Sequence, residues 1–544
     1  MKLLRVERQG AKPAKNAKVK RDLFLGGLGW LGLLAFICVF AAPADARRDR
    51  TVTGDVIKAA RFLTTSRIDD AKVILDDLKK RAPDTVEVKW LEAELAFQTG
   101  DYAGAEKLLD KVPDDAVDGM VGQTKKLAAS TRAVTESFVE RKSPKGHFII
   151  RYASGSHDAA IADLAGEVLD SAWQTIGDDL GLAPADPIRV EILGAPADLA
   201  KMSPLTETEI EKTGTIALSK YNKLMVVSPR ATLFGYPWMD TLVHEYTHLI
   251  VSRLAFDAVP VWLQEGIARF EQTRWRRPPE VALNATEQAL LTTGLKKGRL
   301  ISFDEMHPSM AKLPSQEAAA LAYAEVYTLV GWMHGKIGYK GLRDALAAQK
   351  DGKSARRAVS EALDKSWAAV DKEWRANLKV SADAKARAGK PIKFDKGGVD
   401  SENVGLEHVN ARARKFARLA GMLRARGMLE AAAVEYEKAL AAGNDPFVAG
   451  KLARTLVELG RHDRAIELAT PLATADDQDA VAAVTLGIAR AARHEWPAAV
   501  SAYEQALRVS PFDPQTRCGL AEAYAQIKDA RAARERTACD QLKN

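Results

Sequence analysis

The chain has 544 residues, of which 47% are hydrophobic and 28% charged; this is apolar material for about three to four folded domains and excludes a mainly disordered chain. The formal net charge of +7 is concentrated at the N-terminus, because residues 1–46 hold eight Lys and Arg against three Asp and Glu, which leaves 71 basic and 69 acidic residues elsewhere. This nearly neutral remainder lacks the basic footprint of a nucleic-acid-binding protein, so no nucleic-acid partner is expected.

The first 46 residues have the pattern of an export signal. Residues 1–22 are basic, residues 23–42 form an uninterrupted apolar run, and Ala44-Asp45-Ala46 is a small-residue cleavage pattern. We expect cleavage there and a mature protein that is periplasmic or secreted. The apolar run is also long enough to cross a bilayer, so a single uncleaved N-terminal membrane span is the alternative; it would anchor the protein in the inner membrane, facing the periplasm.

A repeat with a period of 34 residues follows within residues 52–138. A small or polar residue is followed two positions later by a bulky residue and, after three more, by an alanine. The pattern occurs at Ser66/Ile68/Ala71 and again at Gly100/Tyr102/Ala105. We therefore expect a tetratricopeptide-like helical region here.

Residues 139–380 are expected to form an α+β domain with strands first and helices after. Short apolar runs predict strands at 147–152, 188–193 and 224–228. Helical periodicity predicts a helix at 158–176 and further helices from Trp238 onward.

The motif His244-Glu-Tyr-Thr-His248 lies in the first of these later helices. Two histidines four positions apart project from one helix face and can hold one zinc ion through their ring nitrogens, with Glu245 turned toward the water that completes the site. Glu265, seventeen residues after His248, is the candidate third ligand, because two His and one Glu leave a fourth position open. The sequence thus predicts one Zn²⁺ per chain, against the alternative of two core histidines and a solvated glutamate.

These residues, with Pro260-Val-Trp-Leu-Gln-Glu-Gly-Ile-Ala268 around the third ligand, resemble the gluzincin metallopeptidases and most closely the bacterial peptidase-MA-like domains. The resemblance covers residues 140–380 and implies a thermolysin-like fold, with His244, His248 and Glu265 as zinc ligands and Glu245 as the general base of peptide hydrolysis. It also implies that residues 214–219 form the sheet edge beside the cleft, where an extended peptide can pair.

The same resemblance points to a tyrosine that stabilises the oxyanion, within Ala322-Tyr-Ala-Glu-Val-Tyr327. Tyr323 is the first choice and Tyr327 the second, and both also fit positions in an apolar core.

The chain departs from the thermolysin pattern at Arg269, where such enzymes often carry an acid that orients a ligand. The carboxylate that orients His244 or His248 is therefore open, with Asp240 and Glu271 as candidates.

Residues 381–408 lack periodicity and predict a linker. The repeat then returns within residues 409–544, with spacings of 33, 34 and 34, and predicts about four tetratricopeptide hairpins, in which His462 and His494 are framework residues. Its positions are Gly427/Leu429/Ala432, Gly460/His462/Ala465, His494/Trp496/Ala499 and Lys528/Ala530/Ala533. Stacked repeats form concave surfaces that can bind a protein partner or the substrate, and the alternative is a purely scaffolding role for the repeats.

Two cysteines, Cys518 and Cys539, lie nearly equidistant from a predicted turn near Lys528. An antiparallel hairpin would place them at the same level, where either a disulfide or two buried thiols fit.

The expected function is that of an exported zinc metallopeptidase of the gluzincin type, with a peptide or protein substrate. One alternative is a catalytically degenerate peptidase-like adaptor that acts through its repeats; a closed structural zinc would favour a fourth protein ligand and would not need Glu245, which argues against it. The other is a zinc amidase acting on cell-wall material, which no residue excludes.

Overall fold

The computed structural model describes residues 47–276, 283–307, 309–310, 313–378, 392–395, 406, 409–475 and 479–543. The predicted leader, residues 1–46, and most of the predicted linker, residues 381–408, lie outside the described residues. Among the helices that are described, none is both long and apolar enough to cross a bilayer.

In the part of the chain that the structure describes, five helices lie before the first strand, and neighbouring helices pack as hairpins. They are α2 (Arg47–Thr64), α3 (Ile68–Arg81), α4 (Val86–Thr99), α5 (Tyr102–Leu109) and α6 (Met120–Thr135). The bulky residue of the repeat pattern, Ile68 or Tyr102, begins the second helix of a hairpin, and the alanine three positions on, Ala71 or Ala105, is fully buried where the helices meet.

A five-stranded mixed sheet follows, in the order β1-β2-β3-β5-β4. Its strands are β1 (Phe138–Lys142), β2 (Phe148–Ala153), β3 (Ile188–Leu193), β4 (Ala217–Lys220) and β5 (Lys223–Val227). The three central strands are parallel and the two outer strands run antiparallel to their neighbours. The three predicted strands are confirmed, and β1 is an additional strand that the sequence did not predict.

The two faces of the sheet pack against different parts of the chain. Ile150, Val190 and Leu224 belong to the large core formed with α7 (Ala159–Leu180) and α10 (Trp238–Ala255). On the other face, Glu191 and Lys223 are buried and meet Tyr102 of α5, whose hydroxyl lies 3.3 Å from Glu191 Oε1 and 3.2 Å from Lys223 Nζ. The N-terminal hairpins therefore cover part of the sheet through a buried polar cluster.

The other helices of this domain lie between β3 and β4, or after β5 and before the C-terminal hairpins. They are α8 (Pro196–Met202), α9 (Glu207–Thr213), the 3-10 turn η1 (Pro229–Ala231), α11 (Val261–Glu271), α12 (Ala285–Lys297), α13 (Gln316–Lys350), α14 (Ala355–Leu363) and α15 (Trp367–Asn377). Within α13 the helix is interrupted at Gly338, where φ is +60°. The expected α+β domain, strands first and helices after, is confirmed.

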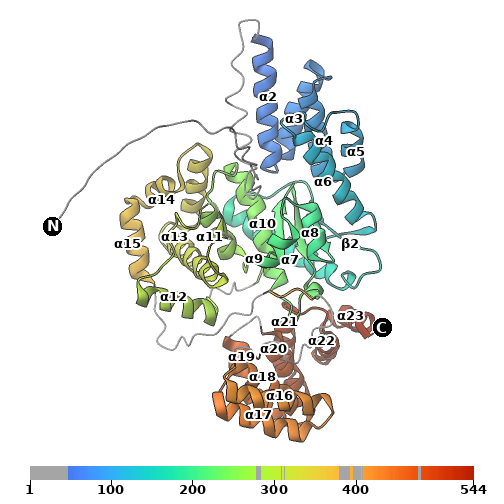
Figure 1. Cartoon of the computed structure of the whole chain (residues 1–544), viewed down its shortest axis with the longest axis vertical. Coiled ribbons are helices and arrows are strands. Elements are labelled where there is room, and N and C mark those ends of the chain that lie inside the picture. Colours follow the sequence, from blue (N-terminus) through green and yellow to red (C-terminus); the bar gives the residue numbers. More distant parts are fainter. Residues whose placement is uncertain are drawn as a thin grey trace, which may run out of the picture. The chain divides into compact units, whose positions relative to one another are not determined.

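Eight helices form the C-terminal hairpins (Figure 1). They are α16 (Ala411–Ala425), α17 (Leu429–Gly443), α18 (Pro446–Glu458), α19 (His462–Ala475), α20 (Ala480–Ala492), α21 (Trp496–Leu507), α22 (Pro514–Gln526) and α23 (Ala532–Lys543). The first residue of each repeat pattern has a positive φ, at Gly427, Gly460, His494 and Lys528 as well as at Ser66 and Gly100. This left-handed residue turns the chain from the first helix of a hairpin into the second.

The last hairpin carries a disulfide between Cys518 of α22 and Cys539 of α23, one of the two alternatives left by the sequence. It also contacts the sheet domain: the buried Arg517 donates from Nη2 to the carbonyl of Ala160, 3.0 Å away, and Arg534 forms an ion pair with Glu167 of α7. Residues of α20, α21 and α22 share one hydrophobic core with the sheet domain.

Candidate metal centre

The helix α10 carries the first half of the motif, and its residues fall on two faces. Leu242, Val243 and Tyr246 point into the core and are fully buried, which fixes the rotation of the helix about its axis. His244 and His248, on another face, remain partly exposed. Because one face of α10 is buried in the core, both imidazoles lie on the face that stays partly exposed.

The helix α11 begins after Pro260 and brings Glu265 toward α10. Gly266, the next residue, lies where α11 touches α13: a Cβ there would stand 2.9 Å from the carbonyl oxygen of Val326 and 2.8 Å from Val330 Cγ2. Only a residue without a side chain permits this approach of the two helices. The Glu-Gly pair thus places the carboxylate between α10 and α13.

The three predicted ligand residues lie together. Nε2 of His244 is 3.1 Å from Nε2 of His248 and 3.2 Å from Oε2 of Glu265, and Nε2 of His248 is 3.5 Å from the same oxygen. Two ligands of a tetrahedral ion with bonds of about 2.0–2.1 Å are separated by about 3.3 Å, so this spacing and this donor set fit Zn²⁺. Among the described residues, these three form a group that could hold a metal ion.

Electrostatics couple the three side chains. Burial opposes charge on His248, but the adjacent Glu265 carboxylate prevails and raises the pKa of His248 to about 9. Burial likewise opposes charge on Glu265, and the two imidazoles lower its pKa well below the usual value. The site therefore favours an ionised Glu265 carboxylate beside a positively charged His248 imidazole.

Two amide side chains hold the imidazoles. Nδ1 of His244 lies 3.3 Å from Oε1 of Gln272; in the tautomer with the proton on Nδ1, this nitrogen donates to the amide oxygen and Nε2 is free to bind a metal. Gln264 hydrogen-bonds His248 and also donates to the carbonyl of Val259. The sequence missed both, although Gln272 lies seven residues after Glu265, two helical turns along the same face.

The carboxylates proposed for this orienting role contact other residues. Asp240 accepts a hydrogen bond from Trp275 and forms an ion pair with Arg276. Glu271 is fully buried beside Asp179, and this burial raises its pKa to about 8. The partners described for these two carboxylates are other side chains, whereas the described partners of the imidazoles are the amides of Gln264 and Gln272.

The departure at Arg269 has a different explanation. Its Nη2 lies 3.0 Å from both carboxylate oxygens of Glu287, a residue that also caps the start of α12. Arg269 thus links α11 to α12, whereas Gln264 and Gln272 hydrogen-bond the two histidines.

Glu245 lies between the helix and the edge of the sheet. It is buried, which raises its pKa although both imidazoles oppose the rise, and its carboxylate accepts a hydrogen bond from the backbone of Ser219 in β4. Since β4 is the last strand in the sheet order, its other side carries no paired strand among the described residues. Residues 217–220 form this edge. They overlap the predicted stretch 214–219 and extend one residue past its end.

The two candidate tyrosines differ in their surroundings. The negative charge of Glu265, together with burial and Glu245, raises the pKa of Tyr323 well above its usual value. Tyr327 packs beside Phe270, with the guanidinium of Arg269 5.4 Å from its ring centre. Of the two tyrosines, Tyr323 is therefore the one whose hydroxyl is influenced by the charge of Glu265.

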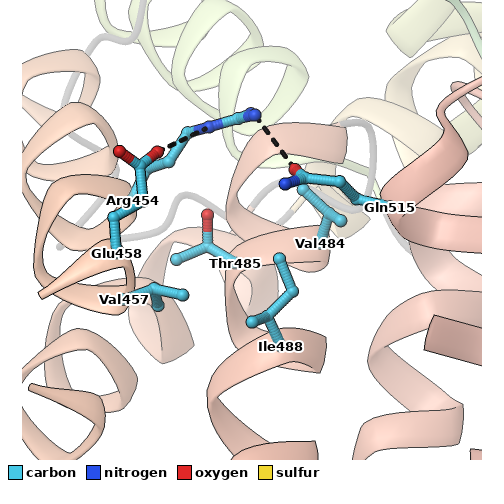
Figure 2. Close-up of a pocket in the computed structure, with 7 residues that line it drawn as sticks. All are labelled: Arg454, Val457, Glu458, Val484, Thr485, Ile488 and Gln515. Atoms are coloured by element: carbon cyan, nitrogen blue, oxygen red, sulfur yellow. Dashed lines mark hydrogen bonds and ion pairs between the residues drawn. The ribbon is translucent and has the colours of Figure 1, made fainter. Parts of the chain in front are cut away.

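A second candidate site lies on the C-terminal hairpins, in a pocket of about 250 Å³ between α18, α20 and α22. Figure 2 shows Arg454 lying across it, with Nη2 3.0 Å from Gln515 Oε1 and Nε 3.9 Å from Glu458 Oε1. Val457, Val484 and Ile488 also line the pocket, below the arginine in this view. The pocket thus combines an arginine that is already paired with Glu458 and Gln515 with apolar side chains.

Comparison with known proteins identifies the central region. Residues 170–380 match the Peptidase MA superfamily. Three solved structures are similar to parts of the chain. They are "MamA AMB-1 P212121" (21% identity, 25% of this chain, 79% of that chain, TM-score 0.22), "MamA RS-1 ArsTM double mutant" (17%, 25%, 97%, 0.17) and "Crystal structure of APC/C hetero-tetramer Cut9-Hcn1" (14%, 91%, 90%, 0.23). A search of curated proteins found no match. The chain thus contains a Peptidase MA superfamily domain, and helical hairpins precede and follow it.

Proposed function

We propose that this protein is a zinc metallopeptidase that hydrolyses peptide bonds. The proposal rests on one observation: two imidazole nitrogens and one carboxylate oxygen from α10 and α11 lie within 4.8 Å of one another in a Peptidase MA superfamily domain. A bound Zn²⁺ would supply Lewis acidity toward a water molecule and the substrate carbonyl.

The side chains of this chain supply the other parts of the reaction. Glu245, beside the ligands, accepts the proton of the attacking water and returns it to the leaving amine. Tyr323 donates a hydrogen bond to the oxyanion of the tetrahedral intermediate. The unpaired side of β4 binds the substrate backbone as an added strand, which places the scissile carbonyl beside Glu245.

The variant Glu245→Gln tests the proposal. It keeps the size of the side chain and removes the base, so we expect cleavage of casein to fall by about 10²–10⁴-fold while bound zinc, measured by metal analysis, stays near one per chain. Wild-type cleavage should stop on chelation and return with zinc. Undiminished cleavage by Glu245→Gln would remove this residue from the mechanism, and a wild-type protein that binds zinc but cleaves nothing would favour the adaptor function.

We further propose that the pocket beneath Arg454 holds an extended part of a protein substrate. Because Ile488 lies on the apolar side of the pocket, Ile488→Asp would place a charge where an apolar side chain binds. The expected result is a higher KM for casein and an unchanged KM for a short peptide that reaches only the metal centre. Equal effects on both substrates would contradict this role.

The sequence of residues 1–46 supports export, and the Cys518–Cys539 disulfide supports an oxidising compartment such as the periplasm. We propose that the protein acts there. Mass spectrometry of its N-terminus, after recovery from membranes and from soluble fractions, distinguishes a cleaved leader from a retained span.

A further inference from the structure

The metal-binding helix α10 is held at its two ends by two different sets of hairpins. Its start contacts the C-terminal hairpins, and the residues just after its end contact the N-terminal hairpins. His244 and His248 lie between these contacts, whereas the third donor, Glu265, lies on α11. The relative position of α10 and α11 therefore decides whether the three donors converge.

The contacts at the start of α10 involve the carbonyl groups that end α21. Tyr236 N donates to the carbonyl of Val509, 3.2 Å away, and the buried Trp238 donates from Nε1 to the carbonyl of Leu507, 3.1 Å away. Gly235 has a φ of +69°, and a Cβ there would stand 2.1 Å from the same Val509 oxygen. The chain enters α10 through a segment that fits closely against the C-terminal hairpins.

The contacts at the other end surround Phe256, which follows the last residue of α10 and has a φ of +50°. Its ring lies 5.9 Å from the ring of Phe62 in α2, and the guanidinium carbons of Arg67 and Arg61 lie 4.6 Å and 5.3 Å from its centre. Lys350 of α13 lies 5.0 Å from the same ring. A bulky residue adopts this left-handed conformation only where its surroundings fix it.

A second link at this end runs through the turn between β4 and β5. Arg253 donates from Nη2 to Asn222 Oδ1, 2.6 Å away, and the backbone N–H of Asn222 donates to Ser66 Oγ, 3.1 Å away. Ser66 is the left-handed residue of the first repeat pattern. The last turn of α10, the sheet edge and the N-terminal hairpins are thus connected by hydrogen bonds.

From these contacts we infer that the two hairpin regions position the metal-binding helix, with Trp238 and Phe256 as the positioning residues. A helix rises about 1.5 Å per residue, so Trp238 and Phe256 lie only about 9 and 12 Å along the axis from the nearest histidine. Displacement of either end would move both imidazoles relative to Glu265. A partner bound to either hairpin region would act on the site through the same contacts. The effect of such a displacement on catalysis rests on the proposed function, whereas its effect on metal binding does not.

The test uses Trp238→Phe and Phe256→Leu in the full chain, with Trp173→Phe as the matched control. Trp173 also donates its ring N–H to a carbonyl, that of Pro184, 3.0 Å away, but it lies on α7 rather than at an end of α10. The readouts are the affinity for Co²⁺, the d–d absorption spectrum of bound Co²⁺, hydrogen exchange of residues 239–255, and the unfolding midpoint.

The two α10 variants should bind Co²⁺ about tenfold more weakly and with an altered spectrum, as changes around metal ligands commonly do. Trp173→Phe should lower the unfolding midpoint without either change. If a core variant does not fold, Arg67→Gln takes its place. The Arg67 side chain is 26% exposed, so this substitution removes one cation from the Phe256 ring without changing the core. It should alter the Co²⁺ spectrum in the same direction as the two α10 variants.

Wild-type affinity and spectrum in the folded α10 variants, or equal changes in the Trp173 control, would overturn the inference. Because Co²⁺ binding is read without substrate, a protein that binds the metal normally but cleaves nothing would contradict the proposed function and leave the positioning role intact.

Discussion

At the scale of single residues, the group of candidate metal ligands could be predicted because its members follow one another in local sequence. His244, His248 and Glu265 belong to two consecutive helices, and helical geometry alone places the two histidines on one face. The residues that orient them could not be found in this way. Gln264 and Gln272 are amides, not the expected acids, and only the packing of α11 against α10 shows that they reach the imidazoles.

The choice between the two tyrosines also required the fold. Tyr323 and Tyr327 are four positions apart on α13 and lie on neighbouring parts of one helix face, so the sequence could not separate them. Their surroundings differ: the charge of Glu265 acts on Tyr323, and the ring of Tyr327 packs against Phe270.

This difference leads to a prediction for two matched variants. Tyr323→Phe removes the oxyanion donor and should lower kcat by about 10²-fold, with little change in KM, because the hydrogen bond forms mainly in the transition state. Tyr327→Phe removes a hydroxyl of the same helix that lacks a hydrogen-bond partner among the described residues, and should leave kcat within about twofold. Steady-state kinetics on one peptide measure both. A larger loss in the Tyr327 variant would reverse the assignment.

At the scale of elements, a short pattern predicted where hairpins turn. The bulky residue of the pattern begins α3, α5, α17, α19 and α21, because the small or polar residue two positions earlier adopts the left-handed conformation that ends the preceding helix. Of the five strands, β1 escaped prediction because its residues, Phe-Val-Glu-Arg-Lys, are mostly polar and exposed. Pairing with β2 stabilises β1, and no sequence pattern within β1 indicates that pairing.

The role of the left-handed residue can be tested with two glycines of one hairpin. Gly460 has a φ of +73° at the turn before α19, so Gly460→Ala is strained and should lower the free energy of unfolding by about 1 kcal/mol or more. Gly450 lies inside α18, where a Cβ would make an ordinary contact of 3.7 Å with Leu472 Cδ1. Gly450→Ala should therefore raise the free energy of unfolding by about 0.5–1 kcal/mol. Urea titration of the full chain checks both signs, and a stabilising Gly460→Ala would contradict the explanation.

At the scale of the whole molecule, the hairpins and the sheet domain share contacts that the sequence did not reveal. The repeats were expected to bind partners, and their period gave no indication that Trp238 would be covered by α21 or that Arg517 would reach the carbonyl of Ala160. These contacts join residues hundreds of positions apart, so they follow from the fold and not from any local pattern. The hairpins therefore contact the domain that carries the candidate metal centre.

The disulfide of the last hairpin gives a test of this support. The bond closes a segment with a sequence separation of 21, so its removal should cost about 3 kcal/mol through the added freedom of the unfolded chain. The hairpin also holds a buried ion pair, Arg517 Nη1 to Glu535 Oε2 at 2.6 Å, and Arg517 contacts the sheet domain. We therefore expect a reductant to lower the stability of both regions together.

Urea unfolding with and without reductant, followed by tryptophan fluorescence, measures this coupling, because Trp238 and Trp262 lie in the sheet domain and are buried. A variant with Cys518→Ser and Cys539→Ser should unfold at the midpoint of the reduced wild type and should not respond to reductant. If the sheet domain kept its midpoint while the last hairpin unfolded separately, the hairpin would be an attached module, and its contacts with α7 would contribute little to the stability of the metal centre.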